Sequence, residues 1–138
     1  MLCNLPQTLP TDVIKLHNAP FTFYLTGSRF FGNITPKSDW DFYASYNKQI
    51  CEWLNDQGFI QASHHLYGDD PNCVKVFTNT NAATTPIHVQ LVADIKAKHQ
   101  CQTILINVLK HVRDKTVARM FWRVAFAAYA AGRQHNDS

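Results

Sequence analysis

The sequence predicts an α+β (mixed α/β) domain with two helices at its C-terminus, and three observations support this class. The chain has 138 residues, a length that fits a single domain on the usual prior of roughly 100–200 residues. It is 46% hydrophobic and 17% charged, which is too apolar and too weakly charged for a disordered chain. Segments of strand composition come first and two long helical segments come last, an order typical of this class.

In the first half of the chain, prolines and glycines separate short segments of strand or helix composition. The segments are an irregular leader over 1–12, a short helix capped by Thr11 or Asp12 and ending at Leu16, a strand over 21–26 that Gly27-Ser28 end, a connection over 29–38, and a strand over 39–45. The first of these strands is assigned because its residues are aromatic and β-branched.

In the second half, the apolar spacing changes from strand to helix periods. The segments are a helix over 47–57 stopped by Gly58, a strand over 59–66, paired strands over 74–78 and 87–92, a helix over 94–112 capped by Asp94, and a last helix over 115–131 ended by Gly132. We expect a single domain over 1–138, with a C-terminal helix and tail over 113–138, because no linker or repeat divides the chain.

Composition excludes several classes of protein. No apolar run approaches the roughly 18 residues of a membrane span, and the N-terminus lacks the basic and apolar regions of a signal peptide. The closest pair of cysteines, Cys51 and Cys73, stands 22 positions apart, whereas zinc ribbons and redox motifs need much shorter spacings. We therefore expect a soluble, cytoplasmic protein that does not act at a membrane.

The net charge of +3 conceals an asymmetry along the chain. Residues 1–94 contain five basic and eight acidic residues, whereas residues 95–138 contain eight basic and two acidic ones, a net +6. Lys115, Arg119 and Arg123 recur at intervals of four and form one stripe on the last helix. This stripe is either a solvated helix surface or a face that binds phosphate, RNA or an acidic partner.

The last helix also has an apolar side. Val117, Phe121, Val124 and Ala128 recur at helical spacing, and further aromatic residues extend the hydrophobic surface around them. So much apolar coverage in a terminal helix indicates either packing in the core or a protein interface.

A dense group of polar residues follows the first strand. Gly27 and Ser28 come directly after it, and glycine allows a backbone to approach a ligand closely. Backbone N–H groups there, the Ser28 hydroxyl and the Arg29 guanidinium are suited to hold phosphate oxygens.

Two carboxylates open the next strand. Asp39 and Asp41 alternate with Trp40 and Phe42, so the strand period of two places both carboxylates on one face and both aromatic rings in the core. Two such carboxylates suit Mg²⁺, which prefers a few carboxylates together with substrate phosphates. Ten residues separate Ser28 from Asp39, enough for the chain to return and bring the phosphate-binding residues to the metal-binding ones.

This arrangement resembles the nucleotidyltransferase signature, in which Gly-Ser precedes Asp-x-Asp by about ten residues. Residues 24–44 contain the pattern Gly-Ser-Arg…Gly-Asn-x-Thr-Pro-x-Ser-Asp-x-Asp-Phe. This pattern is particularly similar to that of the minimal nucleotidyltransferases of toxin–antitoxin pairs, which are members of the polymerase-beta-type superfamily. The resemblance implies a nucleotidyltransferase-like mixed sheet flanked by helices. The alternative is a strand–turn–strand in which Ser38 and Asp39 only satisfy backbone donors.

The resemblance also implies roles for individual residues. Gly27 and Ser28 would hold the β- and γ-phosphates of ATP, and Asp39 and Asp41 would bind Mg²⁺ and stabilise the charge that develops in an in-line displacement. From their charge and proximity, Arg29 and Lys37 are candidates to neutralise the departing pyrophosphate, although both are equally compatible with exposed loop positions.

The sequence departs from this pattern at the third carboxylate, which the superfamily usually supplies from a later strand. The strand over 87–92 has His88 at that place, while the nearby Asp94 fits better as a helix cap. A neutral imidazole at His88 would accept the proton of an attacking hydroxyl, because its reference pKa is about 6.5. Alternatively, the loss of one negative charge weakens the metal site and leaves a nucleotide binder.

Three functions follow from these residues. The first is Mg²⁺-dependent transfer of AMP from ATP to a hydroxyl of a protein, which the family resemblance identifies as a HEPN-type toxin, with this chain as antitoxin. The chain is too short for the extra domain that holds an antibiotic, which favours a macromolecular acceptor. The second is a degraded nucleotidyltransferase fold that inhibits a partner by occlusion. The third is transfer to RNA ends, which only the basic face supports.

Overall fold

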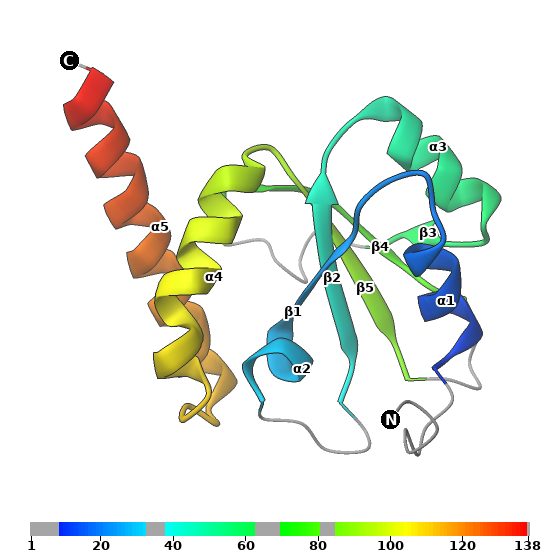
Figure 1. Ribbon diagram of the computed structural model, residues 1–138, viewed down its shortest axis with the longest axis horizontal. Helices are drawn as coiled ribbons and strands as arrows, with labels where there is room; N and C mark the ends of the chain where they lie inside the picture. The colour runs from blue at the N-terminus through cyan, green and yellow to red at the C-terminus, as the bar shows by residue number, and fades with distance from the viewer. Residues whose placement is uncertain (1–8, 33–37, 63–69, 81–84, 138) are drawn as a thin grey trace, which may run out of the picture.

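A computed structural model describes residues 9–32, 38–62, 70–80 and 85–137 of the chain. Within these residues the elements are α1 (Thr11–His17), β1 (Tyr24–Thr26), α2 (Gly27–Phe31), β2 (Trp40–Ser45), α3 (Lys48–Asp56), β3 (Ile60–Gln61), β4 (Cys73–Thr78), β5 (Ile87–Val92), α4 (Ile95–Leu109) and α5 (Lys115–Asp137). The α+β class and the two C-terminal helices are as the sequence predicts (Figure 1).

The five strands form one mixed sheet in the order β1-β2-β5-β4-β3. The central strands β2 and β5 are parallel, with Asp41 opposite His88, and the other pairs are antiparallel. Figure 1 shows α1 and α3 on one side of this sheet and α4 and α5 on the other. The faces of β2 and β5 therefore meet different helices.

The side of the sheet under α1 and α3 carries the main apolar core. Alternate residues of the central strands point into it, because successive side chains of a strand point to opposite faces. The fully buried members include Ala44 of β2, Val89 and Leu91 of β5, and Ile50 and Leu54 of α3. The helix expected over 47–57 is therefore present as α3, and its buried residues Ile50 and Leu54 stand at helical spacing.

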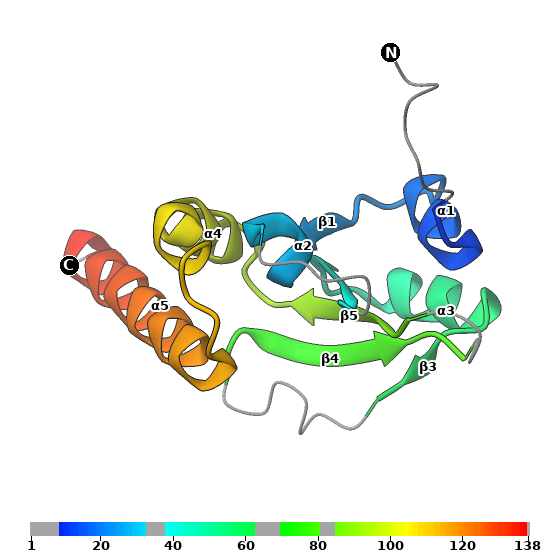
Figure 2. The same ribbon diagram turned by 90° about the horizontal axis from the view of Figure 1, so that it is seen from below.

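Helices α2, α4 and α5 form a second, smaller core. Its buried members are Phe31, Cys101, Leu105, Leu109 and Ala125, and Trp122 packs against them. Figure 2 shows α5 lying alongside α4 on the side away from the sheet. No helix in the described part of the chain has the length and apolar character needed to span a membrane.

Two helix caps test the local predictions. Asp94 caps α4 as expected, because its carboxylate accepts the Ala97 N–H at 3.0 Å. The cap expected for α1 is wrong, since the N-cap is Pro10 and makes no side-chain hydrogen bond. Proline presets a backbone angle suited to a helix start, so α1 begins at Thr11 without a polar cap.

Several segment boundaries differ from those expected. The strand expected over 21–26 is confined to β1, because Phe21 and Phe23 pack their rings on Trp53 instead of pairing in the sheet. The strand expected over 59–66 is described only at β3, and residues 63–69 lie outside the described ranges.

Two helical boundaries also differ. Residues 27–31 form α2, where the sequence predicts a strand end and a connection. The last helix continues through Gly132 to Asp137, so Gly132 does not end it. A single glycine weakens a helix by only about 1 kcal/mol, which neighbouring turns offset.

Candidate functional site

The junction of β1 and α2 brings Gly27 against the carboxylate of Asp41. Thr26, the last residue of β1, lies opposite Asp41 of β2, and Gly27 follows with a φ angle of 69°. A Cβ at this position would collide with the Asp41 carboxylate and lie 3.0 Å from its Cγ atom. Only glycine accommodates both this angle and this contact. The backbone at Gly27 therefore touches a predicted metal ligand.

Asp39 and Asp41 lie at the amino end of β2. Phe42 is buried in the main core and Trp40 stacks on it with ring centroids 6.2 Å apart. The Asp39 side chain is 39% exposed and that of Asp41 is 17% exposed. The alternation expected from the sequence therefore holds: the rings pack together while the carboxylates stay accessible.

His88 of β5 completes a cluster with the two carboxylates. Its Nδ1 donates a hydrogen bond to Asp41 Oδ1 at 3.3 Å and lies 3.9 Å from Asp39 Oδ2. The parallel register places His88 directly across from Asp41. The sequence prediction that His88 occupies the place beside the carboxylate pair is thus confirmed in position.

The environment of His88 favours its charged form. The hydrogen bond to Asp41 raises the pKa of His88 above its usual value, and the negative charges of Asp41 and Asp39 act in the same direction, while burial acts against them. The ring therefore holds its proton more tightly than a free histidine does. This disfavours the neutral imidazole that a general base requires.

Arg29 connects the start of α2 to the start of β2. Its guanidinium donates to the Ser38 carbonyl at 2.9 Å and lies 4.1 Å from the centre of the Trp40 ring. Its Nε atom is buried and has no hydrogen-bond partner among the described residues. Ser28 lies beside Gly27 in the first turn of α2, and Lys37 lies outside the described residues. Arg29 thus links α2 to the residues just before Asp39, the two segments that the signature predicts to lie close together.

The structure separates the predicted partner-binding residues from this cluster. Arg119 and Arg123 are exposed on α5, which packs on α4 rather than on β2 (Figure 2). The side chain of Lys115 lies outside the described part of the structure. Arg119 and Arg123 therefore lie on a different surface from the carboxylate cluster.

Sequence reasoning missed a polar layer between the sheet and α4. The Tyr43 hydroxyl lies 2.6 Å from His99 Nδ1, and the Lys98 amine donates to Gln90 Oε1 at 3.4 Å. The period of two in β2 and β5 already places Tyr43 and Gln90 on the face of Asp41. No comparable signal identifies Lys98, because lysine composition predicts an exposed residue.

The residues at this cluster fit Mg²⁺ only in part. Among the described residues, no group of three or more His, Cys, Asp or Glu side chains is arranged to hold a metal ion. Two carboxylates nevertheless suit Mg²⁺, because this ion usually binds one or two carboxylates and completes its shell with phosphates and water. Asp39 and Asp41 would therefore hold the ion only together with a phosphate-bearing substrate.

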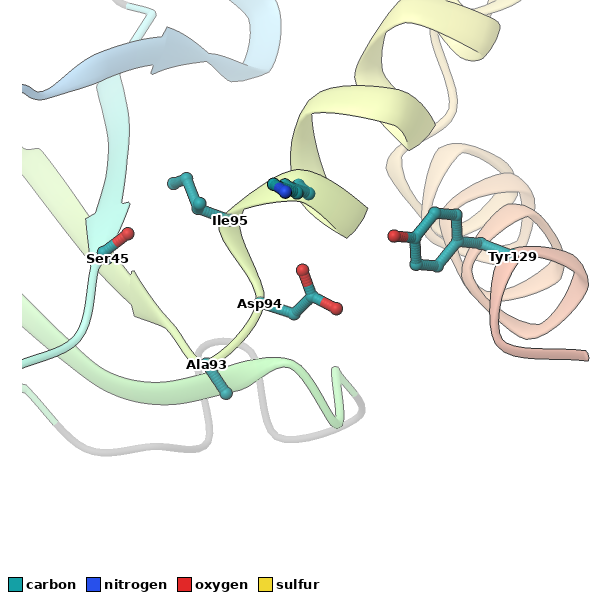
Figure 3. Close-up of a pocket in the computed structure, with 6 residues that line it drawn as sticks. Ser45, Ala93, Asp94, Ile95 and Tyr129 are labelled. Atoms are coloured by element: carbon teal, nitrogen blue, oxygen red, sulfur yellow. The ribbon is translucent and has the colours of Figure 1, made fainter. Parts of the chain in front are cut away.

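A separate pocket lies at the opposite ends of the central strands (Figure 3). Its volume is about 570 Å³, and it is lined by Ser45, Ala93, Asp94, Ile95, Lys96 and Tyr129. The Asp94 carboxylate borders it, and this negative charge opposes a phosphate group. Because Asp39 and Asp41 lie at the amino end of β2 and Ser45 at its carboxyl end, the pocket does not belong to the carboxylate cluster.

The chain was compared with protein-family models, with curated proteins and with solved structures, and nothing among them matches it. A functional conclusion therefore depends on the residues of the site itself.

Proposed function

We propose that this protein is a nucleotidyltransferase that moves AMP from ATP to a hydroxyl group of a protein partner. The observation that carries the proposal is the meeting of Gly27, Asp41 and His88 at one point, with Asp39 beside them. This contact joins the two halves of the Gly-Ser…Asp-x-Asp signature across 14 residues of sequence.

In the proposed reaction, the hydroxyl oxygen of the acceptor attacks the α-phosphorus of ATP, and the hydroxyl proton passes to a water molecule. The bond between that phosphorus and the bridging oxygen breaks, and pyrophosphate leaves. Bound Mg²⁺ would neutralise charge on the phosphates. Asp39 and Asp41 would hold the ion, while the backbone at Gly27 and the Ser28 hydroxyl would bind the terminal phosphates. Arg29 positions these groups, because it joins α2 to the residue before Asp39.

The acceptor in this proposal is a HEPN-type toxin, so that the transfer makes this protein an antitoxin. The support is the resemblance of residues 24–44 to minimal nucleotidyltransferases. The geometry adds that the Asp39 side chain is more than one third exposed. A macromolecular hydroxyl can therefore approach the carboxylates without a closing domain.

A second function is favoured by one observation. His88 forms an ion pair or hydrogen bond with the carboxylates that would bind Mg²⁺, and this contact competes with a metal ion. The same fold would then bind and occlude a partner without transferring a nucleotide. Transfer to RNA ends is supported only by the basic charge of residues 95–138.

Labelling with ATP distinguishes these functions. The protein is incubated with Mg²⁺ and α-labelled ATP, together with purified HEPN-type ribonucleases in one arm and RNA oligonucleotides in another. We expect label on the protein acceptor, and none with Asp39→Asn. Label on RNA alone supports the third function. Inhibition of a ribonuclease that persists in Asp39→Asn without any label supports occlusion and contradicts the transferase.

Two variants at His88 then define its part in the reaction. An asparagine can donate the same hydrogen bond to Asp41 but cannot take up a proton. If His88 acts by orienting Asp41, His88→Asn retains most of the transfer rate and His88→Ala does not. Equal loss in both variants indicates that the imidazole itself takes part in the chemistry.

A further inference from the structure

The imidazole of His88 adjoins both carboxylates of the candidate site. Its Nδ1 atom lies 3.3 Å from Asp41 Oδ1 and 3.9 Å from Asp39 Oδ2. A metal ion bound to both carboxylates would lie about 2 Å from an oxygen of each. The imidazole N–H and such an ion therefore compete for the same oxygens.

The other oxygen of Asp41 also faces a neighbour. A Cβ at Gly27 would collide with Asp41 Oδ2 and lie 3.0 Å from the Cγ atom, so the main chain of Gly27 lies against this oxygen. The Asp41 carboxylate is thus held between the start of α2 and the ring of His88, and its side chain is only 17% exposed. Of these two contacts, the one with His88 can be broken without a change in the main chain.

The sheet keeps His88 in this place. The parallel register of β2 and β5 sets it directly across from Asp41, and its neighbours Ile87 and Val89 are fully buried in the main core. The His88 side chain itself is 16% exposed. The contact with the carboxylates is therefore built into the nucleotide-free protein, and an arriving ion must displace it.

We infer that His88 keeps a divalent metal ion out of the site until a nucleotide brings phosphate ligands with it. Phosphates bound at Gly27 and Ser28 would lie beside Asp41, where their oxygens complete the shell of the ion and offset the lost contact with His88. This role of His88 rests on the proposed function in one respect, since it takes Asp39 and Asp41 as metal ligands. It makes metal binding depend on ATP and involves no proton transfer.

Titration with Mn²⁺ in the absence of nucleotide tests this role. Mn²⁺ prefers the same oxygen ligands as Mg²⁺, and the electron paramagnetic resonance signal of the free ion is lost on binding. The full chain is compared with His88→Ala, which removes the hydrogen bond, and with His88→Asn, whose amide can donate it. We expect His88→Ala to bind Mn²⁺ at least about tenfold more tightly than the parent, and His88→Asn to stay close to the parent.

Two further variants locate the change in affinity. His88→Ala combined with Asp41→Asn is expected to lose the gain, because one ligand charge is removed. His111→Ala removes an exposed imidazole after α4; it is the matched control and is expected to bind Mn²⁺ as the parent does. Circular dichroism of each variant verifies the fold.

A fluorescent analogue of ATP tests the dependence on nucleotide. We expect the parent to bind this analogue at least about tenfold more tightly with Mn²⁺ than with a chelator, although it binds Mn²⁺ alone weakly. Equal binding of the analogue in both conditions, or tight binding of Mn²⁺ alone by the parent, would overturn the role of His88.

The His88 variants can overturn it in three other ways. Weaker Mn²⁺ binding in His88→Ala would mean that the ring is a ligand or a support of the ion. Equal affinity in the parent and both variants would show no competition. A gain shared by alanine and asparagine would mean that the hydrogen bond is not the cause.

The proposed transferase succeeds or fails separately. A gain of Mn²⁺ affinity in His88→Ala, without label on any acceptor, would support this role of His88 and contradict the transfer reaction. Label on the acceptor, with no gain of Mn²⁺ affinity in His88→Ala, would do the reverse.

Discussion

The two faces of the central strands differ in what they carry. Toward α1 and α3, strands β2 and β5 present Phe42, Ala44, Val89 and Leu91, all buried among apolar neighbours. Toward α4, the same strands present carboxylates, an imidazole, a phenol and an amide, in the residues Asp41, His88, Tyr43 and Gln90. Because successive residues of a strand point to opposite faces, neighbouring residues of β2 and β5 alternate between the apolar core and the polar side of the sheet.

The apolar face of β2 and β5 is therefore expected to supply most of the stability, and the polar face the proposed activity. Apolar burial stabilises the fold without regard to which polar groups lie on the far side of the sheet. The polar face contributes less to stability, because each buried polar group there must first lose its hydration. Replacements on the apolar face are therefore expected to lower mainly the stability, and replacements on the polar face to lower mainly the proposed activity.

The largest expected effect is the loss of transfer in Asp41→Asn. The substitution removes the negative charge of a predicted metal ligand while it keeps the shape of the side chain. We expect the rate of AMP transfer to fall by about 10²–10³ or more, with little change in the unfolding midpoint. Labelling with α-labelled ATP and urea denaturation measure the two quantities.

Asp56→Asn at an exposed position of α3 is the matched control for this change of charge. It is expected to alter neither quantity. A similar loss of transfer in both variants would mean that net charge, and not the carboxylate cluster, governs the reaction.

The opposite face is tested by Leu91→Ala. Leu91 is fully buried in the main core, and shortening it leaves a cavity. We expect the free energy of unfolding to fall by about 2–5 kcal/mol, while the transfer rate per folded molecule stays nearly constant. In Val74→Ala, at an exposed position of β4, the free energy of unfolding is expected to change by less than about 0.5 kcal/mol. Equal values for the two variants would contradict the assignment of this core.

Gly27→Ala acts on both properties at once. An alanine here has a strained positive φ, and its methyl group collides with the Asp41 carboxylate. We expect a loss of about 1–3 kcal/mol in the free energy of unfolding and a larger proportional loss of transfer. Gly32→Ala is the matched control, since Gly32 also has a positive φ but an added Cβ there would meet no atom of the described residues within 4 Å. If the two variants lose transfer equally, contact with Asp41 is not what requires glycine at position 27.

The pattern of the sequence predicts the central strands more accurately than it predicts the short elements. Alternation over 39–45 and 87–92 predicts β2 and β5 nearly to the residue. Helix α2 is not predictable in this way, because it has five residues and begins with a glycine. Its helical form depends on tertiary contact, in which Phe31 packs edge-on against Trp122, 91 positions away.

In the candidate site, too, some positions follow from the local sequence pattern and others depend on contacts between segments distant in sequence. The placement of Asp39, Asp41 and His88 follows from strand period and register alone. The close approach of Gly27 to Asp41 depends on how β1 pairs with β2, which no local pattern encodes. The apolar residues of α5 are ambiguous for a different reason: a helix with apolar residues on two sides does not indicate which side is covered.

The smallest expected effect concerns Lys98, the charge most deeply buried in the polar layer among the described residues. Its amine donates to Gln90 at 3.4 Å and lies 4.1 Å from the Trp122 ring centre and 5.7 Å from that of Tyr43. Burial lowers the pKa of Lys98 below its usual value. The carboxylates of Asp70 and Asp41 and the neighbouring thiols of Cys73 and Cys101 oppose this shift.

Because burial lowers its pKa, Lys98 binds its proton less tightly in the folded chain than in the unfolded chain. Its contribution to the free energy of unfolding therefore rises with pH, from the lowered pKa up to the unfolded value near 10.5. Lys98→Met keeps an unbranched chain against Trp122 and removes the titrating group. We expect this variant to be more stable than the parent by about 1 kcal/mol at pH 7, with an advantage that shrinks toward pH 10. Urea denaturation across this range, with the exposed Lys96→Met as control, measures the difference. A constant difference across the range would mean that folding does not lower the pKa of Lys98, and a variant less stable at pH 7 would mean that Lys98 is a net stabilising contact of the polar face.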